Sequence, residues 1–374
     1  MIPYGHHSIN EDDINAVADV LRGDWLTTGP FVEKFELELE KMVGAKCAVV
    51  SSGTAALHCA FAAIDLQPGD EVITPPITFI ATQATAALSG ASIVFADVLD
   101  DTANIDPTAV EAAITKKTKA IVAVDYAGHP ADLSELRTIA DKYGIYLIED
   151  AAHSLGSKYK DQPVGSIADI TTFSFFPTKN ITSGEGGAIA SNNEDLLLKA
   201  KRFGRQGMIK NRDEMVLEID GPWHQEVHNF GLNYRLPDVL CALGISQLSR
   251  IQEFKKSRAE LFSKYQEILA DNKNLRLPTK KNFVDPMWHL YPIRIPSEKR
   301  RETFIKLREN GIGVQVNYLP AHMHPVFAKN QIHPKSFPVA EKFYGEEISL
   351  PMMSFNSQLD DKYFSRLAEL LVIN

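Results

Sequence analysis

The stretch FSFFPTKNITSGEGG, residues 173–187, decides the fold family of this 374-residue chain. It begins as an apolar strand, passes a single lysine, Lys179, and ends in a run of glycines. A lysine between an apolar strand and a glycine-rich turn is expected to be partly removed from water, which lowers its pKa and makes the neutral amine available as a nucleophile. Most lysines are plain surface residues, but the glycines after Lys179 let the backbone approach a ligand closely. The stretch therefore predicts a reactive lysine at a strand end.

Short β-branched runs alternate with longer amphipathic stretches on both sides of this lysine, between about residues 45 and 195. Most of the runs are continuously apolar, which is typical of strands in a parallel sheet that helices cover on both faces. The predicted strands are Cys47–Ser51, Val72–Thr74, Ile93–Ala96, Ala120–Val124, Ile145–Ile148, Ile170–Phe175 and Ala188–Ala190. The pattern predicts an α/β fold with a mainly parallel central sheet.

The pattern changes after about residue 245. The elements predicted there are a long helix at 250–269, a proline-bearing strand at His289–Ile295, a helix at 298–310 and a strand at Val314–Asn317. This order indicates a smaller C-terminal α+β domain. We therefore expect an N-terminal arm and large domain in residues 1–248 and a small domain in residues 249–374.

A helix is also predicted near the start of the chain, from Glu11 to Gly23. Asn10 is a good N-cap for it, and Ile14 and Leu21 recur on one face.

The composition is that of an ordinary globular protein, with 44% hydrophobic residues, 23% charged residues and a net charge of −9. An acidic chain is not expected to bind nucleic acid in general, because that needs a basic face. Three widely spaced cysteines suit a reducing compartment better than a disulfide scaffold. The start of the chain has no apolar signal segment, and no run of about 18 apolar residues occurs, so we expect a cytoplasmic protein without a membrane span.

Three more motifs lie where predicted strands end. Residues 51–56 (SSGTAA) follow the first strand and open a helix, whose free N–H groups can bind a phosphate, although a plain strand-to-helix turn has the same composition. Asp150 closes another strand, where open α/β sheets bind ligands, although a solvated turn carboxylate would look alike. Phe79 follows a third strand and either lies against a flat heterocycle or packs in the core.

One cofactor needs all four features. Pyridoxal phosphate (PLP) requires an amine for its aldehyde, an acid for its pyridine nitrogen, a flat contact for its ring and donors for its phosphate. The order of the motifs therefore predicts a PLP site built around Lys179.

The chain resembles the DegT/StrS family of PLP-dependent nucleotide-sugar aminotransferases. The resemblance runs from DWLTTGP (24–30), through the motifs above, to NYR (233–235) and SLP (349–351). It implies the PLP-dependent transferase fold of aspartate aminotransferase. The segments DYAGHP (125–130) and DAAHSLG (150–156) are most similar to a subgroup that aminates C4 of UDP-4-keto-6-deoxy-N-acetyl-hexosamines on the route to pseudaminic acid.

The resemblance implies a role for each matched residue. Lys179 would carry PLP and then move a proton between the amino donor and the cofactor, while Asp150 would keep the pyridine nitrogen protonated. The expected cofactor-binding residues are Gly53, Thr54, Ala55, Phe79, Asp150, His153, Ser174, Lys179 and Asn233. Asn233 matches a residue that reaches the phosphate from the other subunit, which implies a homodimer with shared active sites. The expected substrate-binding residues are Thr28, Arg235 and Tyr318.

Some positions depart from the family or stay open. Gln206 stands where many relatives have histidine. The segment 214–225 is either a substrate-facing loop or a surface insertion. His322 and His324 have no acid or thiolate near them in the sequence, so no metal site is expected there.

The implied reaction has two halves. An amino donor, expected to be L-glutamate, leaves its amino group on PLP, and the group then passes to a UDP-linked keto-sugar. One rival function is that of a PLP-dependent sugar dehydratase of the same fold, but its branch has histidine at the position of Lys179. A non-catalytic regulatory protein and an ordinary amino-acid aminotransferase are two further rivals.

Overall fold

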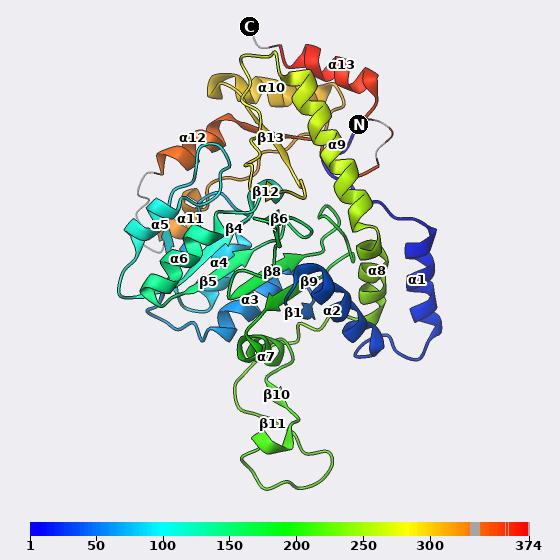
Figure 1. Ribbon diagram of the computed structural model, residues 1–374, viewed down its shortest axis with the longest axis vertical. Coiled ribbons are helices and arrows are strands. Elements are labelled where there is room, and N and C mark those ends of the chain that lie inside the picture. The colour runs from blue at the N-terminus through cyan, green and yellow to red at the C-terminus, as the bar shows by residue number, and fades with distance from the viewer. Residues whose placement is uncertain (330–336, 356, 358, 373–374) are drawn as a thin grey trace.

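A seven-stranded sheet forms the centre of the structure, a computed structural model that describes residues 1–329, 337–355, 357 and 359–372 (Figure 1). The strand order is β1-β9-β8-β5-β4-β2-β3. The strands are β1 (Lys46–Val50), β2 (Glu71–Thr74), β3 (Ser92–Phe95), β4 (Thr118–Val124), β5 (Tyr146–Asp150), β8 (Ile170–Ser174) and β9 (Gly187–Ser191). Each of the seven strands predicted between residues 45 and 195 is present within about two residues at either end, which confirms the α/β fold.

The sheet is mainly parallel, with one reversal. Strands β3, β2, β4, β5 and β8 run parallel to one another, whereas β9 is antiparallel to both β8 and β1. Strand β9 follows β8 after only the glycine-rich stretch that contains Lys179, and a short connection of this kind returns the chain antiparallel. As a result, Lys179 lies at the edge where β1, β5 and β8 all end.

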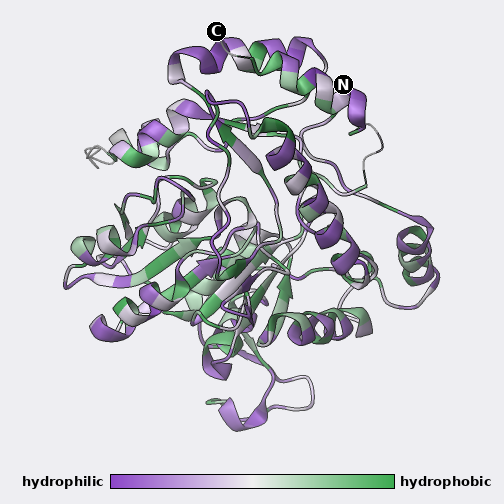
Figure 2. Ribbon diagram, turned by 45° about the horizontal axis from the view of Figure 1, so that its top comes forward, coloured by the Kyte–Doolittle hydropathy of each residue, from purple (hydrophilic) through white to green (hydrophobic). Residues whose placement is uncertain are grey.

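Helices cover both faces of the sheet (Figure 1). On one face lie α3 (Gly53–Ala63), α4 (Ala81–Leu88) and α7 (Glu194–Phe203). On the other face lie α2 (Pro30–Val43), α5 (Pro107–Ala113), α6 (Leu133–Tyr143) and α8 (Asp238–Ser249). Figure 2 shows the hydrophobic residues concentrated in the strands and on the inward faces of these helices, which is why the strands read as continuous apolar runs.

The C-terminal part of the chain has a core of its own, which includes Leu261, Tyr291 and Leu367. Its elements are α9 (Ile251–Leu269), β13 (Tyr291–Arg294), α10 (Ser297–Glu309), α11 (Pro325–Lys329), α12 (Pro338–Glu346), β14 (Glu347–Leu350) and α13 (Asp361–Leu370). The predicted strand at Val314–Asn317 is wrong, because that segment makes only an isolated bridge from Gln315 to Ser349. The boundary at residue 248 stays a prediction.

The first residues of the chain lie against this C-terminal part. The N–H of Ile2 donates to the carbonyl of Gly311 at 2.8 Å. The side-chain amide of Asn317 donates to the hydroxyl of Tyr4 at 2.6 Å, and the N–H of Met352 donates to the carbonyl of Tyr4 at 3.1 Å. Residues 2–8 therefore form a strap, which lies next to the turn that carries Lys179.

Two segments lie on the outside of the molecule (Figure 1). One is α1 (Glu11–Arg22), the predicted helix, which Asn10 caps as expected. It packs on α8 and buries Val20, whereas Ile14 is 51% and Leu21 is 59% exposed. The other is the extension formed by β10 (Met208–Ile209) and β11 (Glu226–Val227) with the loop between them.

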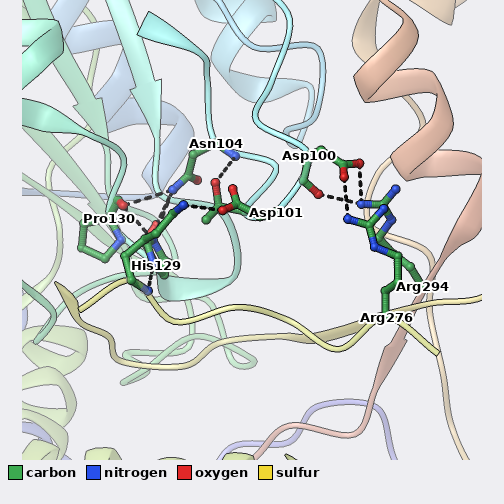
Figure 3. A network of polar contacts seen from close by, with 9 residues as sticks. Asp100, Asp101, Asn104, His129, Pro130, Arg276 and Arg294 are labelled. Atoms are coloured by element: carbon green, nitrogen blue, oxygen red, sulfur yellow. Dashed lines mark hydrogen bonds and ion pairs between the residues drawn. The ribbon is translucent and has the colours of Figure 1, made fainter. Parts of the chain in front are cut away.

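A network of charged side chains ties the loop after β3 to the C-terminal part (Figure 3). Asp100 accepts hydrogen bonds from Arg294 at 2.8 Å and from Arg276 at 2.5 Å. Arg294 also pairs with Glu346 at 2.6 Å, and Asp101 pairs with Lys281. The two parts of the chain are thus held together by ion pairs.

No helix in the described ranges is long and apolar enough to cross a membrane.

Candidate active site

Asp150 lies at the end of β5, buried beneath the carboxyl edge of the sheet. Its Oδ2 accepts a hydrogen bond from the Thr82 hydroxyl at 2.7 Å, and its Oδ1 accepts one from the N–H of Ala152 at 3.2 Å. Burial raises the pKa of Asp150, and the two hydrogen bonds and the charge of Lys179 oppose that rise. The side chain is therefore an acid fixed in orientation and close to the lysine.

Lys179 lies one turn beyond β8 and is half-buried. Its N–H donates to the carbonyl of Phe176 at 2.9 Å, and the neighbouring Asn180 side chain donates to the carbonyl of Met287 at 3.2 Å. These bonds fix the turn. Burial lowers the pKa of Lys179 to about 8, against a smaller opposing effect of Asp150. A larger share of Lys179 is therefore neutral near pH 7 than of an ordinary lysine, as the sequence predicted.

The start of α3 meets the end of β8 at very short range. A Cβ added to Gly53 would lie 2.7 Å from the Cβ of Ser174, so only glycine fits there. The hydroxyl of Ser52 accepts the N–H of Ala55 at 3.1 Å. Among the described residues, no acceptor faces the N–H of Gly53 or of Thr54. Two backbone donors and the Ser174 hydroxyl are thus available to an anion at a helix N-terminus.

Three side chains named from the sequence meet beside Asp150. His153 is buried, and its Nε2 lies 3.2 Å from the hydroxyl of Tyr318. The ring centroid of Tyr318 lies 6.1 Å from that of Phe79. Phe79 is 59% exposed, which excludes the core-packing interpretation and leaves its ring free to contact a flat ligand.

His289 belongs to the same site, although the sequence analysis did not single it out. It is buried, and its ring centroid lies 4.2 Å from that of His153. The Nδ1 atoms of both histidines are buried without a hydrogen-bond partner among the described residues. Burial lowers the pKa of both rings, and the charge of Lys179 adds to this effect. Both imidazoles are therefore neutral near pH 7, each with a nitrogen available to a ligand.

The remaining candidates lie elsewhere in this chain. Thr28 and Arg235 line a separate cavity of about 890 Å³ between α2 and α7, whose lining does not include Lys179 or Asp150. Asn233 is exposed, and its Oδ1 accepts a hydrogen bond from Arg235 at 2.9 Å. Within one chain, these three residues do not meet the lysine.

Two further results bear on the sequence analysis. Thr82, which orients Asp150, was missed because a threonine inside a helix carries no motif. His322 is buried and pairs with Glu341 at 3.3 Å. The described part of the chain holds no group of three or more His, Cys, Asp or Glu side chains placed to share a metal ion.

Comparison with known proteins gives a family and close relatives. The model of the DegT/DnrJ/EryC1/StrS aminotransferase family matches residues 7–367. The UDP-4-amino-4,6-dideoxy-N-acetyl-beta-L-altrosamine transaminase of Campylobacter jejuni is 38% identical over 370 residues, which cover 97% of this chain and 95% of that protein.

Solved structures agree with this result. PseC of Helicobacter pylori, an aminotransferase involved in the biosynthesis of pseudoaminic acid, superposes with a TM-score of 0.90 and 31% identity, over 99% of this chain and 97% of that one. The putative sugar aminotransferase Spr1654 of Streptococcus pneumoniae, in its PMP form, superposes with a TM-score of 0.90 and 29% identity, over 99% and 98% of the two chains. It has also been solved in a PLP form.

Proposed function

The chain belongs to the DegT/DnrJ/EryC1/StrS aminotransferase family, and we propose that it transfers an amino group from L-glutamate to C4 of a UDP-linked 4-keto-6-deoxy sugar. The observation that carries the proposal is the placement of Lys179 and Asp150 at neighbouring strand ends, each within reach of the other's charge. The named relatives favour a UDP-linked amino sugar as the product. All three cysteines are buried free thiols, which agrees with a cytoplasmic location.

The residues at the site fit PLP. Lys179 offers an amine for the aldehyde, and Asp150 offers a fixed carboxylate for the ring nitrogen. The unpartnered Nδ1 of His153 offers a contact for the ring substituents. The cradle in which a Cβ on Gly53 would collide with Ser174 offers backbone and hydroxyl donors for the phosphate. When bound, PLP supplies the electron sink that makes the bond to hydrogen at the donor's α-carbon labile.

The protein's own residues then do two things. Asp150 holds the proton on the ring nitrogen, which keeps the ring electron-poor. Lys179, with its pKa lowered to about 8, takes the proton from the donor's α-carbon as a free amine and returns it on the other side of the transferred nitrogen. Because one amine both accepts and donates the proton, a pKa lowered toward neutrality by burial suits both steps.

We further propose that the working unit is a homodimer in which Asn233 and Arg235 serve the site of the other subunit. The proposal is supported by apolar side chains that one chain leaves in water. Trp25 is 58% exposed and Phe230 is 97% exposed, as are the apolar residues of α1 described above. Exposed aromatic residues of this kind mark protein–protein contacts.

The first experiment is the visible spectrum of the PLP-loaded protein before and after L-glutamate. We expect the yellow band of lysine-bound PLP, and we expect glutamate to bleach it. The bleached protein is then given UDP-linked 4-keto and 3-keto sugars, and return of the band with the 4-keto sugar alone supports the C4 assignment.

Each rival function predicts a different outcome. A yellow band that no amino acid bleaches would contradict transamination, and loss of water from the sugar would indicate a dehydratase. No band at all would indicate a non-catalytic protein. Sedimentation analysis of the same sample tests the dimer.

A further inference from the structure

Asp125, directly after β4, and Glu149, on β5, are two fully buried acids that have no cation beside them among the described residues. Ala123 pairs with Glu149 across the two strands. Side chains alternate along a strand, so Asp125 points to the same face as Glu149, and Asp150 points to the opposite face. The two acids therefore meet in the apolar core under α6, on the other side of the sheet from Asp150.

The two carboxyl groups are hydrogen-bonded to each other. Asp125 also accepts the N–H of Ala131 at 2.9 Å and the hydroxyl of Ser154 at 2.5 Å. Glu149 accepts the hydroxyl of Thr171 at 2.8 Å through Oε2, whereas its Oε1 is buried without a donor among the described residues. Because an ionised carboxylate can only accept, a hydrogen bond between two carboxyl groups requires a proton on one of them.

The charges around the pair lead to the same conclusion. Burial raises the pKa of both carboxyls, the charge of Glu149 raises that of Asp125 further, and the charge of Asp150 raises that of Glu149. The hydroxyls of Ser154 and Thr171 oppose this rise, but they carry no charge. The positive charge of Lys179 acts on Asp150. Two acids in contact in a core of low dielectric do not both ionise near neutral pH, so one proton stays between them.

The pair also joins the ends of three strands that lead into the candidate active site. The N–H of Asp125 donates to the carbonyl of Asp150 at 3.2 Å, which ties β4 to β5. The Ser154 hydroxyl, which Asp125 accepts, follows His153 directly in the chain. The bond from Thr171 to Glu149 ties β5 to β8, the strand that leads to Lys179. A change in the pair should therefore move the residues that surround the cofactor site.

We propose that Asp125 and Glu149 share one proton, and that the pair positions Asp150 and His153 for catalysis. The shared proton is independent of the proposed function, whereas the positioning role rests on it. Both acids act through their neighbours, because they lie on the opposite face of the sheet from the ring acid. They are positioning residues and do not touch the reacting atoms.

The first test is the infrared spectrum of the PLP-loaded protein at pH 7, where a protonated carboxyl gives a carbonyl band separate from those of carboxylates. We expect the wild-type protein to lose such a band in Glu149→Gln, because the amide N–H replaces the shared proton. Glu347 is a second buried acid, and burial raises its pKa to about 8, so Glu347→Gln is the matched control and should remove a different band. If the spectra of wild type and Glu149→Gln are the same in this region, the proposal is overturned.

The pH dependence of stability counts the same proton. The pKa of the pair is higher in the folded chain than in the unfolded chain, so the proton contributes stability that is complete below about pH 4 and is lost as the pH rises toward the raised pKa. Between about pH 5 and pH 7, the folding equilibrium constant should fall about tenfold more per pH unit in wild type than in Glu149→Gln. Denaturant titrations that gave parallel pH dependences would contradict a shared proton.

The positioning role is tested by the rates of the two half-reactions. Asp125→Ala removes the acceptor of Ser154 and of Ala131, and should lower the maximum rates about 10- to 100-fold with little change in the substrate concentrations that give half of them. Asp125→Asn keeps an acceptor oxygen and offers an amide to Glu149, and should recover all but about threefold of the rate.

Two further variants separate positioning from stability. Arg294→Met lies far from the pair in the sequence and should lose stability without losing rate. Ser154→Ala removes only the bond beside His153 and should show a smaller rate loss of the same kind as Asp125→Ala. If Asp125→Ala and Ser154→Ala lose stability alone, as Arg294→Met should, the pair does not position the site.

The outcomes also separate this inference from the proposed function. If the infrared and stability tests detect the shared proton but the wild-type protein reacts with no amino acid, the aminotransferase proposal is contradicted and the shared proton stands. If the wild-type protein reacts with glutamate and Glu149→Gln keeps every carboxyl band, only the acid pair is wrong.

Discussion

The polar groups around Lys179 and those around Asp100 are both partly or fully buried, but only the charged groups around Asp100 are all joined in ion pairs. Asp100 accepts hydrogen bonds from two arginines (Figure 3). Arg294 also pairs with Glu346. At the carboxyl edge of the sheet, by contrast, His153 and His289 each have a buried ring nitrogen without a partner among the described residues.

The difference indicates that the region around Asp100 holds the structure together, whereas the region around Lys179 binds a ligand. Paired buried charges hold two parts of a chain in one arrangement. Unpaired buried donors lower the stability of the protein alone and become useful only when a ligand completes them. Substitutions should therefore affect catalysis at one region and stability at the other.

The largest expected effect is that of Lys179→Ala. Removing the amine should lower the rate by at least about 10⁴-fold and abolish the yellow band, since no other group can carry the cofactor or the proton. Thermal unfolding of the PLP-free variant should match or exceed that of wild type, because a buried amine with a lowered pKa has been removed. A variant that turned over normally would mean that a different lysine reacts.

Asp150→Asn should have the next largest effect. The variant keeps the size of the side chain and can still bond to Thr82, but it cannot hold a charge against the ring nitrogen. We expect a rate loss of about 10²- to 10⁴-fold in both half-reactions with the cofactor still bound. Glu149→Gln, one residue earlier on the same strand, is the control, and a larger loss there would move the role of ring acid to Glu149.

Arg294→Met tests the region around Asp100, where we expect a loss of stability without a loss of catalytic rate. Leaving Asp100 and Glu346 without their shared arginine should cost about 3–5 kcal/mol of unfolding free energy. Lys281→Met removes a more exposed partner of the same loop and should cost less than about 1 kcal/mol. Denaturant titration measures both. If the folded fraction of Arg294→Met lost catalytic rate as well, the network would be part of the active site.

The smallest expected effect is the pH dependence of the Lys179 amine, which a titration measures. The pKa of Lys179 is lowered to about 8, so the neutral amine of PLP-free protein should increase about tenfold for each pH unit up to pH 8 and then level off. The rate of PLP uptake should follow the same curve. Because Asp150 raises the pKa of Lys179, the midpoint should move to lower pH in Asp150→Asn. A midpoint near that of an ordinary lysine would show that the amine is not desolvated.

Local pattern was enough to predict the strands, and it singled out Lys179 and Asp150, which the structure places at one edge of the sheet. Strands such as β4 and β5 are buried on both faces, so their residues are continuously apolar and easy to locate. Lys179 and Asp150 were found because each follows such a run, and the topology then placed both at one edge.

The parts that the sequence could not predict depend on distant contacts. The antiparallel direction of β9 depends on its pairing with β1 and β8, which its own residues do not reveal. The segment at Val314–Asn317 has β-branched residues, but it makes only one bridge, from Gln315 to Ser349. The sequence analysis did not single out Arg258, whose burial depends on distant parts of the chain and whose Nη1 donates to the carbonyls of Trp288 and Met352.

The strap of residues 2–8 is synthesised first, but several of its partners lie near the C-terminus and are synthesised last. The amide of Asn317 and the hydroxyl of Tyr4 are 313 residues apart in the sequence, and the strap's other partners include Gly311 and Met352. A ribosome that adds about 5–20 residues per second needs on the order of half a minute to join them. During that interval Ser8 can already meet Gln247 and Arg250, but the part of the strap around Tyr4 has no partner and the small cavity that Lys179 and the strap line together lacks one wall. The large sheet can therefore form before the small cavity beside Lys179 is complete, and the cavity closes only when the last part of the chain has folded.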